Sequence, residues 1–277
     1  MEIKKIKLGQ TEYAYYELPN RGKPKLLLLH GMMVESHCFS LLAPLLQRDF
    51  HVLLLDLKGH GQSGRGQSYD TDYTNDAIVA DMHSFWEQVI GEPFVIAGYS
   101  LGGQYLMKFA GTYPSLVKAA IIIDSAPALS FKGVLKILWL LLTTPKVFKN
   151  AEHVRRFYDK KSAAGFGDYM LKYCVAQDAQ GRYSVAYDKK NLSPNTVAKG
   201  KVRTADLWDA LAKITAPTII LRAGDSFVIS DKIEARMVVS IADCEVRHFP
   251  GLGHNLVFSN PQDVAEAMLD FVARKLR

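Results

Sequence analysis

Two glycines that flank a serine constrain this chain more than any other feature. Residues 98–102 place Ser100 between Gly98 and Gly102, directly after the apolar run 94–97 and directly before a helical pattern that begins at Gly103. A strand that turns straight into a helix brings two backbones into close approach, and glycine has no Cβ atom to obstruct it. We therefore expect Ser100 to adopt strained backbone angles and to expose its hydroxyl at the end of a strand.

Continuous apolar runs recur along the chain and predict strands that are buried on both faces, as in a parallel sheet. These runs are Lys25–His30, Val52–Asp56, Phe94–Tyr99, Ala119–Asp124, Pro217–Ala223 and Cys244–Phe249. Helical patterns lie between and after them, at Ser40–Gln47, Asn75–Ile90, Gly102–Tyr113, Ile233–Ile241 and Pro261–Leu276. This alternation predicts an α/β fold, with helices on both faces of a mostly parallel sheet. Residues 1–7 alternate charged and apolar side chains, which indicates an edge strand and not a signal peptide.

The alternation breaks between residues 127 and 205, where the charge also changes. This segment contains fifteen Lys and Arg against five Asp and Glu, a net charge of +10, whereas the whole chain carries +6. We interpret residues 127–205 as a helical cap inserted into a core formed by residues 1–126 and 206–277. Its charges are either a solvated surface or an attraction for an anionic substrate. No nucleic-acid-binding motif accompanies them, so no nucleic-acid partner is expected.

The cap segment contains the longest apolar stretch of the chain, residues 134–142. It is too short to span a bilayer, and we expect no transmembrane segment. We expect the stretch to pack between the cap and the core. The alternatives are an acyl-binding pocket and contact with a lipid surface.

The three cysteines, Cys38, Cys174 and Cys244, are far apart in the sequence and show no paired spacing. Such a sparse, odd count indicates free thiols in a reducing cytoplasm. We expect these cysteines to be small buried residues, with exposure of Cys38 to an active-site cleft as the alternative.

Four motifs occur in order along the chain. The first apolar run ends at His30-Gly31-Met32, the second leads into the glycine-rich loop 56–63, the third leads into residues 98–102, and the last precedes Gly251–His254. In this order the motifs resemble the α/β-hydrolase superfamily with a helical cap, over nearly the whole chain. The resemblance implies an α/β-hydrolase fold and hydrolytic chemistry at a serine. It does not identify the substrate, because the superfamily supports many reactions.

By this resemblance Ser100 is the nucleophile and His254 is its general base. A serine hydroxyl is a weak nucleophile at neutral pH and needs a base within hydrogen-bond distance. An imidazole can accept a proton and return it at that pH. The expected oxyanion hole consists of two backbone N–H groups, those of Met32 and Leu101. We expect two other histidines, His30 and His60, to brace the loops around this site.

Two acidic residues are candidates for orienting His254. Asp225 lies near the position where the family's acid usually occurs, after the strand 217–223. If Val228 sets the register, however, that position holds Ser226. Asp124 lies 24 residues after Ser100, which resembles family members whose acid follows the next strand. We favour Asp124 and keep Asp225 as the alternative.

Together these features predict a serine hydrolase that cleaves a small to medium carboxylic ester through an acyl-enzyme on Ser100. One alternative applies the same groups to a C–C bond of a keto-enol acid, a lactone, an amide or a thioester. Another is a non-catalytic receptor with a hydrolase fold. No metal-ligand spacing or phosphate-binding loop is present, so we expect no metal and no cofactor. The expected partner is a small-molecule acyl substrate, anionic in one interpretation, and a homo-oligomer is left open.

Overall fold

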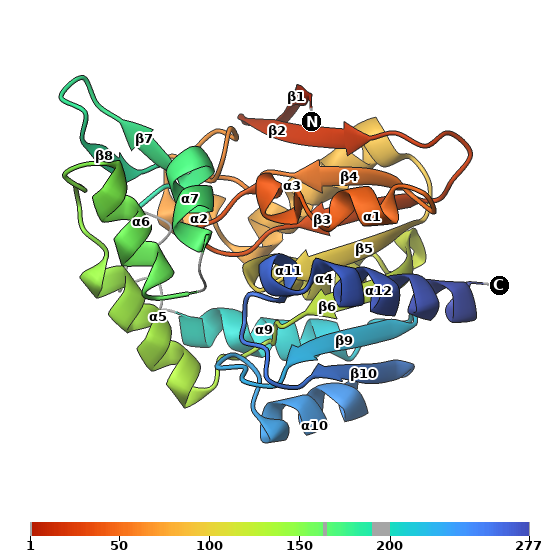
Figure 1. The fold of residues 1–277 in the computed structure, drawn as a ribbon. Coiled ribbons are helices and arrows are strands. Elements are labelled where there is room, and N and C mark those ends of the chain that lie inside the picture. The colour runs from red at the N-terminus through yellow and green to blue at the C-terminus, as the bar shows by residue number, and fades with distance from the viewer. Residues whose placement is uncertain (1, 163–164, 190–199, 277) are drawn as a thin grey trace.

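An eight-stranded sheet forms the centre of the molecule in the computed structural model, which describes residues 2–162, 165–189 and 200–276 (Figure 1). In spatial order its strands are β1 (Ile3–Leu8), β2 (Thr11–Leu18), β4 (His51–Leu55), β3 (Lys25–Leu29), β5 (Phe94–Tyr99), β6 (Val117–Ile123), β9 (Thr218–Ala223) and β10 (Cys244–Phe249). β1 and β2 run antiparallel at one edge, and the other six strands are parallel. The predicted mostly parallel sheet and the N-terminal edge strand are confirmed.

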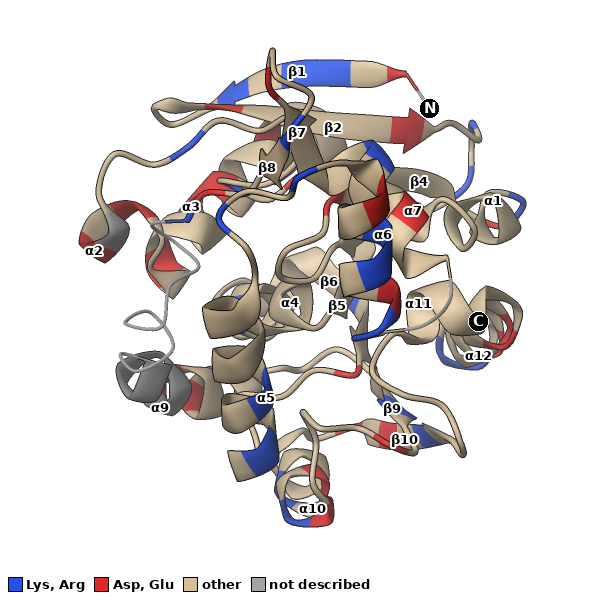
Figure 2. Cartoon of the chain, turned by 60° about the vertical axis from the view of Figure 1, so that its left-hand side comes forward, with Lys and Arg blue, Asp and Glu red and all other residues tan. Residues whose placement is uncertain are grey.

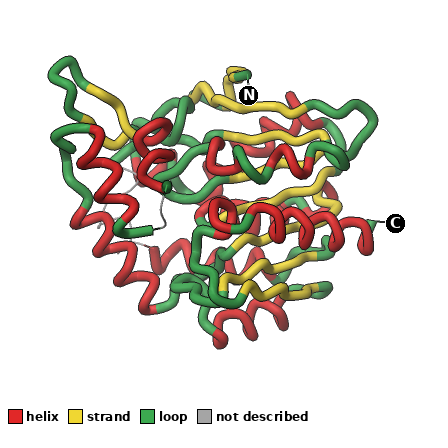
Figure 3. The backbone as a smooth tube through the Cα atoms, viewed as in Figure 1, coloured by secondary structure: helices red, strands yellow, loops and turns green. Residues whose placement is uncertain are grey.

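The sheet separates two hydrophobic cores, with helices on both faces (Figure 3). On β3, Leu26 and Leu28 enter one core, and Leu27 and Leu29 enter the other. The first face is covered by α1 (Ala43–Leu46) and α12 (Pro261–Lys275), and the second by α3 (Asn75–Phe85), α4 (Leu101–Thr112), α9 (Gly200–Leu211) and α10 (Asp231–Ser240). Because both faces of the central strands are buried, their sequences are continuously apolar.

Two predicted helices differ from the observed ones. The pattern at 40–47 contains only the short helix α1, which a 3-10 turn at Ser36–Phe39 precedes. The pattern at 75–90 is α3 followed by a π-helical turn, Trp86–Ile90, that ends at Gly91 with φ of 69°. A separate short helix, α2 (Tyr69–Asp72), precedes α3.

Between β6 and β9 the chain leaves the sheet and forms a separate layer, on the left in Figure 1. This layer contains α5 (Phe131–Thr143), α6 (Ala151–Asp159), α7 (Phe166–Tyr169), a π-helical turn (Met170–Cys174) and the hairpin β7 (Val175–Gln177) and β8 (Tyr183–Val185). The segment is thus not helical throughout. Gly181, with φ of 77°, allows the hairpin turn, and the Asp178 carboxylate accepts hydrogen bonds from two backbone N–H groups within it. Residues 190–199 of the predicted cap lie outside the described residues.

The expected packing of the stretch 134–142 is wrong for one face of α5. Leu135 is 51% exposed, Trp139 is 45% exposed and Leu142 is 71% exposed. Ile137 and Leu140, on another face of the same helix, line a cavity. The helix therefore buries part of its apolar surface and leaves the rest uncovered by the core.

The parallel strands bring several predicted site residues to one edge of the sheet. His30, Ser100 and Asp124 each come directly after a parallel strand, namely β3, β5 and β6. The carboxyl ends of parallel strands meet at the same edge, which is where open α/β sheets bind ligands. The loop after β10 carries His254 to the same edge.

His30 holds the loops beneath this edge, as expected, and the Nδ1 of His60 lies 3.2 Å from the Lys58 carbonyl oxygen within its own loop. His30 Nδ1 lies 2.8 Å from the Gly31 carbonyl, and His30 Nε2 accepts a hydrogen bond of 2.9 Å from the Leu57 N–H. The neutral ring thereby joins the loops after β3 and β4. Burial lowers the pKa of His30 to about 4, and burial together with the neighbouring His30 lowers the pKa of His60 to about 3.

Stability should fall as the solution is acidified, because these two histidines resist protonation in the folded state. An unfolded histidine binds a proton below about pH 6.5. The unfolded chain therefore binds more protons between that pH and the lowered pKa values, about 4 for His30 and about 3 for His60. We expect the free energy of unfolding in urea to be largest above about pH 6.5 and to decrease from there to about pH 4. His60→Gln should flatten this decrease. An unchanged slope in His60→Gln would contradict the account.

Gly111 permits the close contact between α4 and α9. A Cβ atom at this position would lie 2.1 Å from the backbone oxygen of Ala210. We expect Gly111→Ala to lower the free energy of unfolding by about 1–3 kcal/mol, because the two helices must move apart. Gly253→Ala is the matched control, since no atom lies within 4 Å of its added Cβ. Equal stability of the two variants in urea would show that the helices separate without cost.

Candidate active site

The turn from β5 into α4 has the strained geometry that the sequence predicts. Ser100 has φ of 52° and ψ of −116°. A Cβ atom on Gly98 would lie 2.4 Å from the Gly102 carbonyl oxygen, and one on Gly102 would lie 2.2 Å from the Leu29 carbonyl oxygen. Both positions therefore require glycine, and the close crossing holds Ser100 at the tip of the turn.

Ser100, His254 and Asp124 form one hydrogen-bonded series. His254 Nε2 lies 3.0 Å from Ser100 Oγ, and His254 Nδ1 lies 2.6 Å from Asp124 Oδ2. Because a carboxylate accepts, Nδ1 carries the hydrogen and donates it to Asp124. Nε2 is then left to accept the hydrogen of the Ser100 hydroxyl. The imidazole also packs between Tyr99 and Phe227, with ring centroids 5.1 and 4.6 Å away, which fixes its orientation.

Asp124 is fully buried, and neighbouring donors hold its carboxylate in place. The Ala223 N–H donates to Oδ1 over 3.1 Å, and the Ser226 hydroxyl donates to Oδ2 over 3.0 Å. Ser226 Oγ in turn accepts from the backbone N–H groups of Val228 and Ile229. With these two donors and His254, the buried carboxylate has the hydrogen bonds that offset its loss of water.

Ser226 is a residue whose role the sequence reasoning missed. It occupies the position where the register of Val228 places an acid, and from there it donates to Asp124. That register was the available signal. The serine hydroxyl donates to a carboxylate that comes from the end of another strand, β6.

Asp225 is not brought to His254. It is exposed and lines the cavity described below, and its backbone N–H donates to the Leu252 carbonyl over 3.0 Å. Within the described ranges its side chain makes no hydrogen bond or ion pair, whereas Asp124 takes the position beside Nδ1.

The Met32 N–H belongs to the loop after β3, and the Leu101 N–H belongs to the first turn of α4, next to Ser100. Leu101 is the first residue of α4, so its N–H has no acceptor within the helix. A Cβ atom on Gly31, which precedes Met32, would lie 3.3 Å from the Ser100 Cβ. Neither N–H group has an acceptor among the residues that the structure describes. Both are therefore available to a ligand.

Backbone strain is concentrated at these loops. Among the described residues other than glycine, Met33, Ser100 and Asp124 are those with positive φ, of 67°, 52° and 40°. Such backbone conformations cost free energy, and they are held in place by the structure around them.

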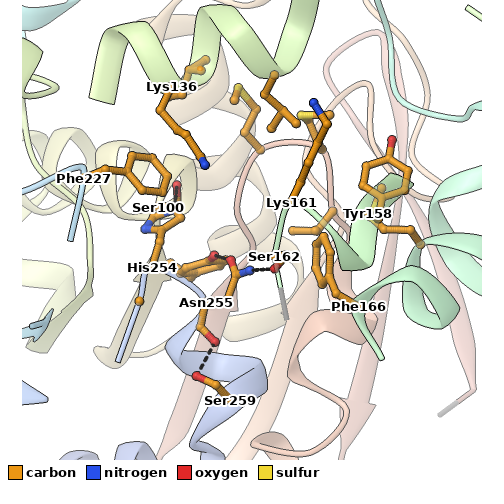
Figure 4. Close-up of a pocket in the computed structure, with 18 of the residues that line it drawn as sticks. Ser100, Lys136, Tyr158, Lys161, Ser162, Phe166, Phe227, His254, Asn255 and Ser259 are labelled. Carbon is orange, nitrogen blue, oxygen red and sulfur yellow. Dashed lines mark hydrogen bonds between the residues drawn. The ribbon is translucent and has the colours of Figure 1, made fainter. Parts of the chain in front are cut away.

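A cavity of about 380 Å³ opens onto Ser100 and His254 (Figure 4). Its lining is mostly apolar and includes Met33, Val34, Ile137, Leu140, Phe166, Met170 and Phe227. Asn255 is a polar residue of the lining. Its side chain accepts a hydrogen bond from the Tyr99 hydroxyl over 2.8 Å and donates one to Ser162. Two lysines, Lys136 and Lys161, also line the cavity.

The two lysines bring positive charge to this cavity from the layer above the sheet. In Figure 4 the Lys136 side chain extends from α5 toward Ser100 and Phe227. Burial and the like charge of Lys136 lower the pKa of Lys161. Neither lysine forms an ion pair with a residue that the structure describes.

The cysteines are free thiols, as expected. Cys38 and Cys174 are buried, and burial raises the pKa of both thiols well above its ordinary value. Cys38 does not line the cavity, so its alternative exposure there is wrong. Within the described part of the chain, no group of three or more His, Cys, Asp or Glu side chains could hold a metal ion. No described helix combines the length and apolar character needed to cross a membrane.

The chain is similar to known hydrolases over almost its full length. It is 26% identical over 286 residues to monoacylglycerol lipase ABHD6 of Homo sapiens, which covers 99% of this chain and 82% of that protein. It is 24% identical over 262 residues to the sn-1-specific diacylglycerol lipase ABHD11 of Mus musculus, covering 90% and 81%. The solved structure of E-2-(acetamidomethylene)succinate hydrolase superimposes with a TM-score of 0.87 at 20% identity, over 98% of this chain and 99% of that one. Residues 26–267 match the profile of the alpha/beta hydrolase family. The chain therefore belongs to the alpha/beta hydrolase family.

Proposed function

We propose that this protein is a serine hydrolase that cleaves a small to medium carboxylic ester through an acyl-enzyme on Ser100. The observation that carries the proposal is the contact series from Asp124 through His254 to Ser100, with distances of 2.6 and 3.0 Å. A hydroxyl, an imidazole and a buried carboxylate in this order are the groups that acyl transfer needs.

The reaction has two halves. In the first, His254 Nε2 accepts the proton of Ser100 as Oγ attacks the ester carbonyl carbon, and the negative charge on the carbonyl oxygen is stabilised by the N–H groups of Met32 and Leu101. The imidazolium then returns the proton to the departing alkoxide. In the second half, His254 deprotonates a water molecule as its oxygen attacks the acyl carbon. The bond from the carbonyl carbon to Oγ then breaks, and the imidazolium returns the proton to Oγ, which releases the carboxylic acid and restores Ser100.

Asp124 keeps His254 in the tautomer that this reaction needs. A buried carboxylate that accepts from Nδ1–H leaves Nε2 as the base, and it stabilises the imidazolium that forms. We assign Ser226 as a positioning residue, because its hydroxyl holds the same carboxylate oxygen that faces His254.

The largely apolar lining of the cavity favours the acyl or alkyl part of an ester. Residues of the layer between β6 and β9 form part of that lining, so we propose that this layer is a cap that selects the substrate. The relatives named as monoacylglycerol and diacylglycerol lipases are consistent with an ester substrate.

A second candidate function keeps the same groups but acts on an anionic compound, through a C–C bond, a lactone, an amide or a thioester. The observation that favours it is the presence of Lys136 and Lys161 in the cavity wall. The solved structure of E-2-(acetamidomethylene)succinate hydrolase, a named hydrolase of a dicarboxylate, has the same fold. Cleavage of an anionic diketone, without turnover of any p-nitrophenyl ester, would favour this candidate. A non-catalytic receptor would instead fail to react with a fluorophosphonate.

Removal of the nucleophile should abolish turnover. We expect Ser100→Ala to lower kcat for p-nitrophenyl butyrate by at least about 10⁴-fold, because no other group can form the acyl-enzyme. The exposed Ser40→Ala is the control and should retain wild-type turnover. Comparable rates in Ser100→Ala and the wild type would exclude the proposed mechanism.

The kcat values of two variants should distinguish the two candidate acids, Asp124 and Asp225. We expect Asp124→Asn to lower kcat by about 10⁴-fold, because an amide at this position favours the wrong imidazole tautomer. Asp225→Asn is an equally conservative change and should lower kcat by less than about tenfold, since Asp124 and not Asp225 is the hydrogen-bond partner of His254 Nδ1. Steady-state kinetics with p-nitrophenyl butyrate measure both. A larger loss in Asp225→Asn would identify Asp225 as the acid.

A further inference from the structure

One face of α5 exposes a continuous apolar stripe. The exposed fractions are 77% for Phe131, 51% for Leu135, 45% for Trp139 and 71% for Leu142. At 100° per residue these four side chains fall within an arc of about 80° on a single face of the helix. We call these four residues the α5 stripe. Large side chains gathered in this way at a surface mark an interaction site more often than scattered ones do.

Lysines border the α5 stripe, and acidic residues are absent from the sequence around it. From residue 125 to residue 151 the chain contains Lys132, Lys136, Lys146 and Lys149 and no Asp, Glu or Arg. Figure 2 shows the basic residues of α5 in blue with no acidic residue along the helix. Lys132 is exposed and lies next to the α5 stripe around the helix at about 100° per residue, so positive charge adjoins the apolar surface directly.

Trp139 connects the apolar and basic parts of this surface. The Nζ of Lys136 lies 5.1 Å from the centroid of its ring, and the Nζ of Lys161 lies 3.4 Å from it. An indole with one side on an apolar stripe and the other against ammonium groups has the character of a side chain at a membrane–water interface.

We propose that the α5 stripe docks on an anionic lipid surface, with α5 lying parallel to the membrane in the headgroup layer. A basic amphipathic helix with Phe, Trp and Leu on its apolar face is bound there by burial of apolar area and by attraction to anionic lipids. The 13 residues of α5 suit this lying orientation, since a spanning helix needs about 20.

The charge pattern favours a lipid surface over a second copy of this chain. In a two-fold symmetric dimer through α5 the same basic patch would meet itself, which brings the positive charge of one copy near that of the other. An anionic surface instead complements the positive charge of residues 125–151.

Docking through α5 also brings the cavity close to the lipid. Ile137 and Leu140 line the cavity from a different face of the same helix. One face of α5 would then contact the membrane while another face lines the cavity. An apolar ester would have only a short path from the lipid to the cavity.

The test is co-sedimentation with vesicles of phosphatidylcholine alone and of phosphatidylcholine mixed with phosphatidylglycerol. We expect the wild type to bind the anionic vesicles and to lose binding as salt is raised. The double variant Phe131→Ser and Leu142→Ser should lower the partition coefficient by at least about tenfold. The double variant Lys132→Gln and Lys146→Gln should weaken binding to anionic vesicles selectively.

Val239→Ser is the matched control for the apolar variant. Val239 is an 82% exposed apolar residue on α10, and its loss should leave vesicle binding unchanged. No binding to anionic vesicles, or equal binding by the wild type and the Phe131/Leu142 variant, would overturn the proposal. A dimer that the same variant dissociates, without vesicle binding, would assign the stripe to a second copy.

This inference is separable from the proposed function. The Phe131/Leu142 variant should hydrolyse soluble p-nitrophenyl butyrate at the wild-type rate, because its two positions lie outside the cavity lining. Conversely, Ser100→Ala should still bind anionic vesicles. Loss of vesicle binding in Ser100→Ala, with the fold intact by circular dichroism, would contradict a docking surface located on α5.

Discussion

The close crossing of β5, α4 and the end of β3 is the constraint on which the rest of the site depends. Gly98 and Gly102 let these backbones approach to a distance that no side chain would permit. The approach forces Ser100 into a positive φ and leaves its hydroxyl at the carboxyl edge of the sheet. Asp124 and His254 come to the same edge, because they follow parallel strands whose carboxyl ends lie there. The strain at Ser100 is compatible with folding because two buried cores hold the strands on either side.

The sequence allowed prediction of the features that are encoded locally. Six continuous apolar runs predicted six parallel strands, because burial on both faces removes the alternation that marks other strands. The motif around Ser100 could be recognised because the backbone requires glycine at positions 98 and 102. The loop of His254 offers a weaker local signal, since Gly251 has a φ of 72° but Gly253 has open space around it. The choice between Asp124 and Asp225 could not be made in the same way. It depends on which carboxylate approaches Nδ1 in space, and the two residues are about a hundred positions apart along the chain.

Ser226 and the α5 stripe show why the remaining features were missed or misjudged. The register of Val228 pointed to position 226, but the contribution of Ser226 is a hydrogen bond to Asp124, about a hundred residues away, which a local pattern does not show. The stretch 134–142 is as apolar as a core segment, yet Leu142 is 71% exposed. Hydrophobic composition predicts that a segment will avoid water, but it does not say whether the protein core or another apolar phase will cover it.

The central claim is that Ser100 attacks a carbonyl carbon whose oxygen is stabilised by two backbone N–H groups. A crystal structure of the protein after reaction with an alkyl fluorophosphonate tests this directly, because the phosphonyl group imitates the tetrahedral intermediate. We expect a covalent bond from Ser100 Oγ to phosphorus, with the phosphonyl oxygen about 3 Å from the nitrogens of both Met32 and Leu101. An adduct on another residue, or a phosphonyl oxygen directed away from both N–H groups, would contradict it.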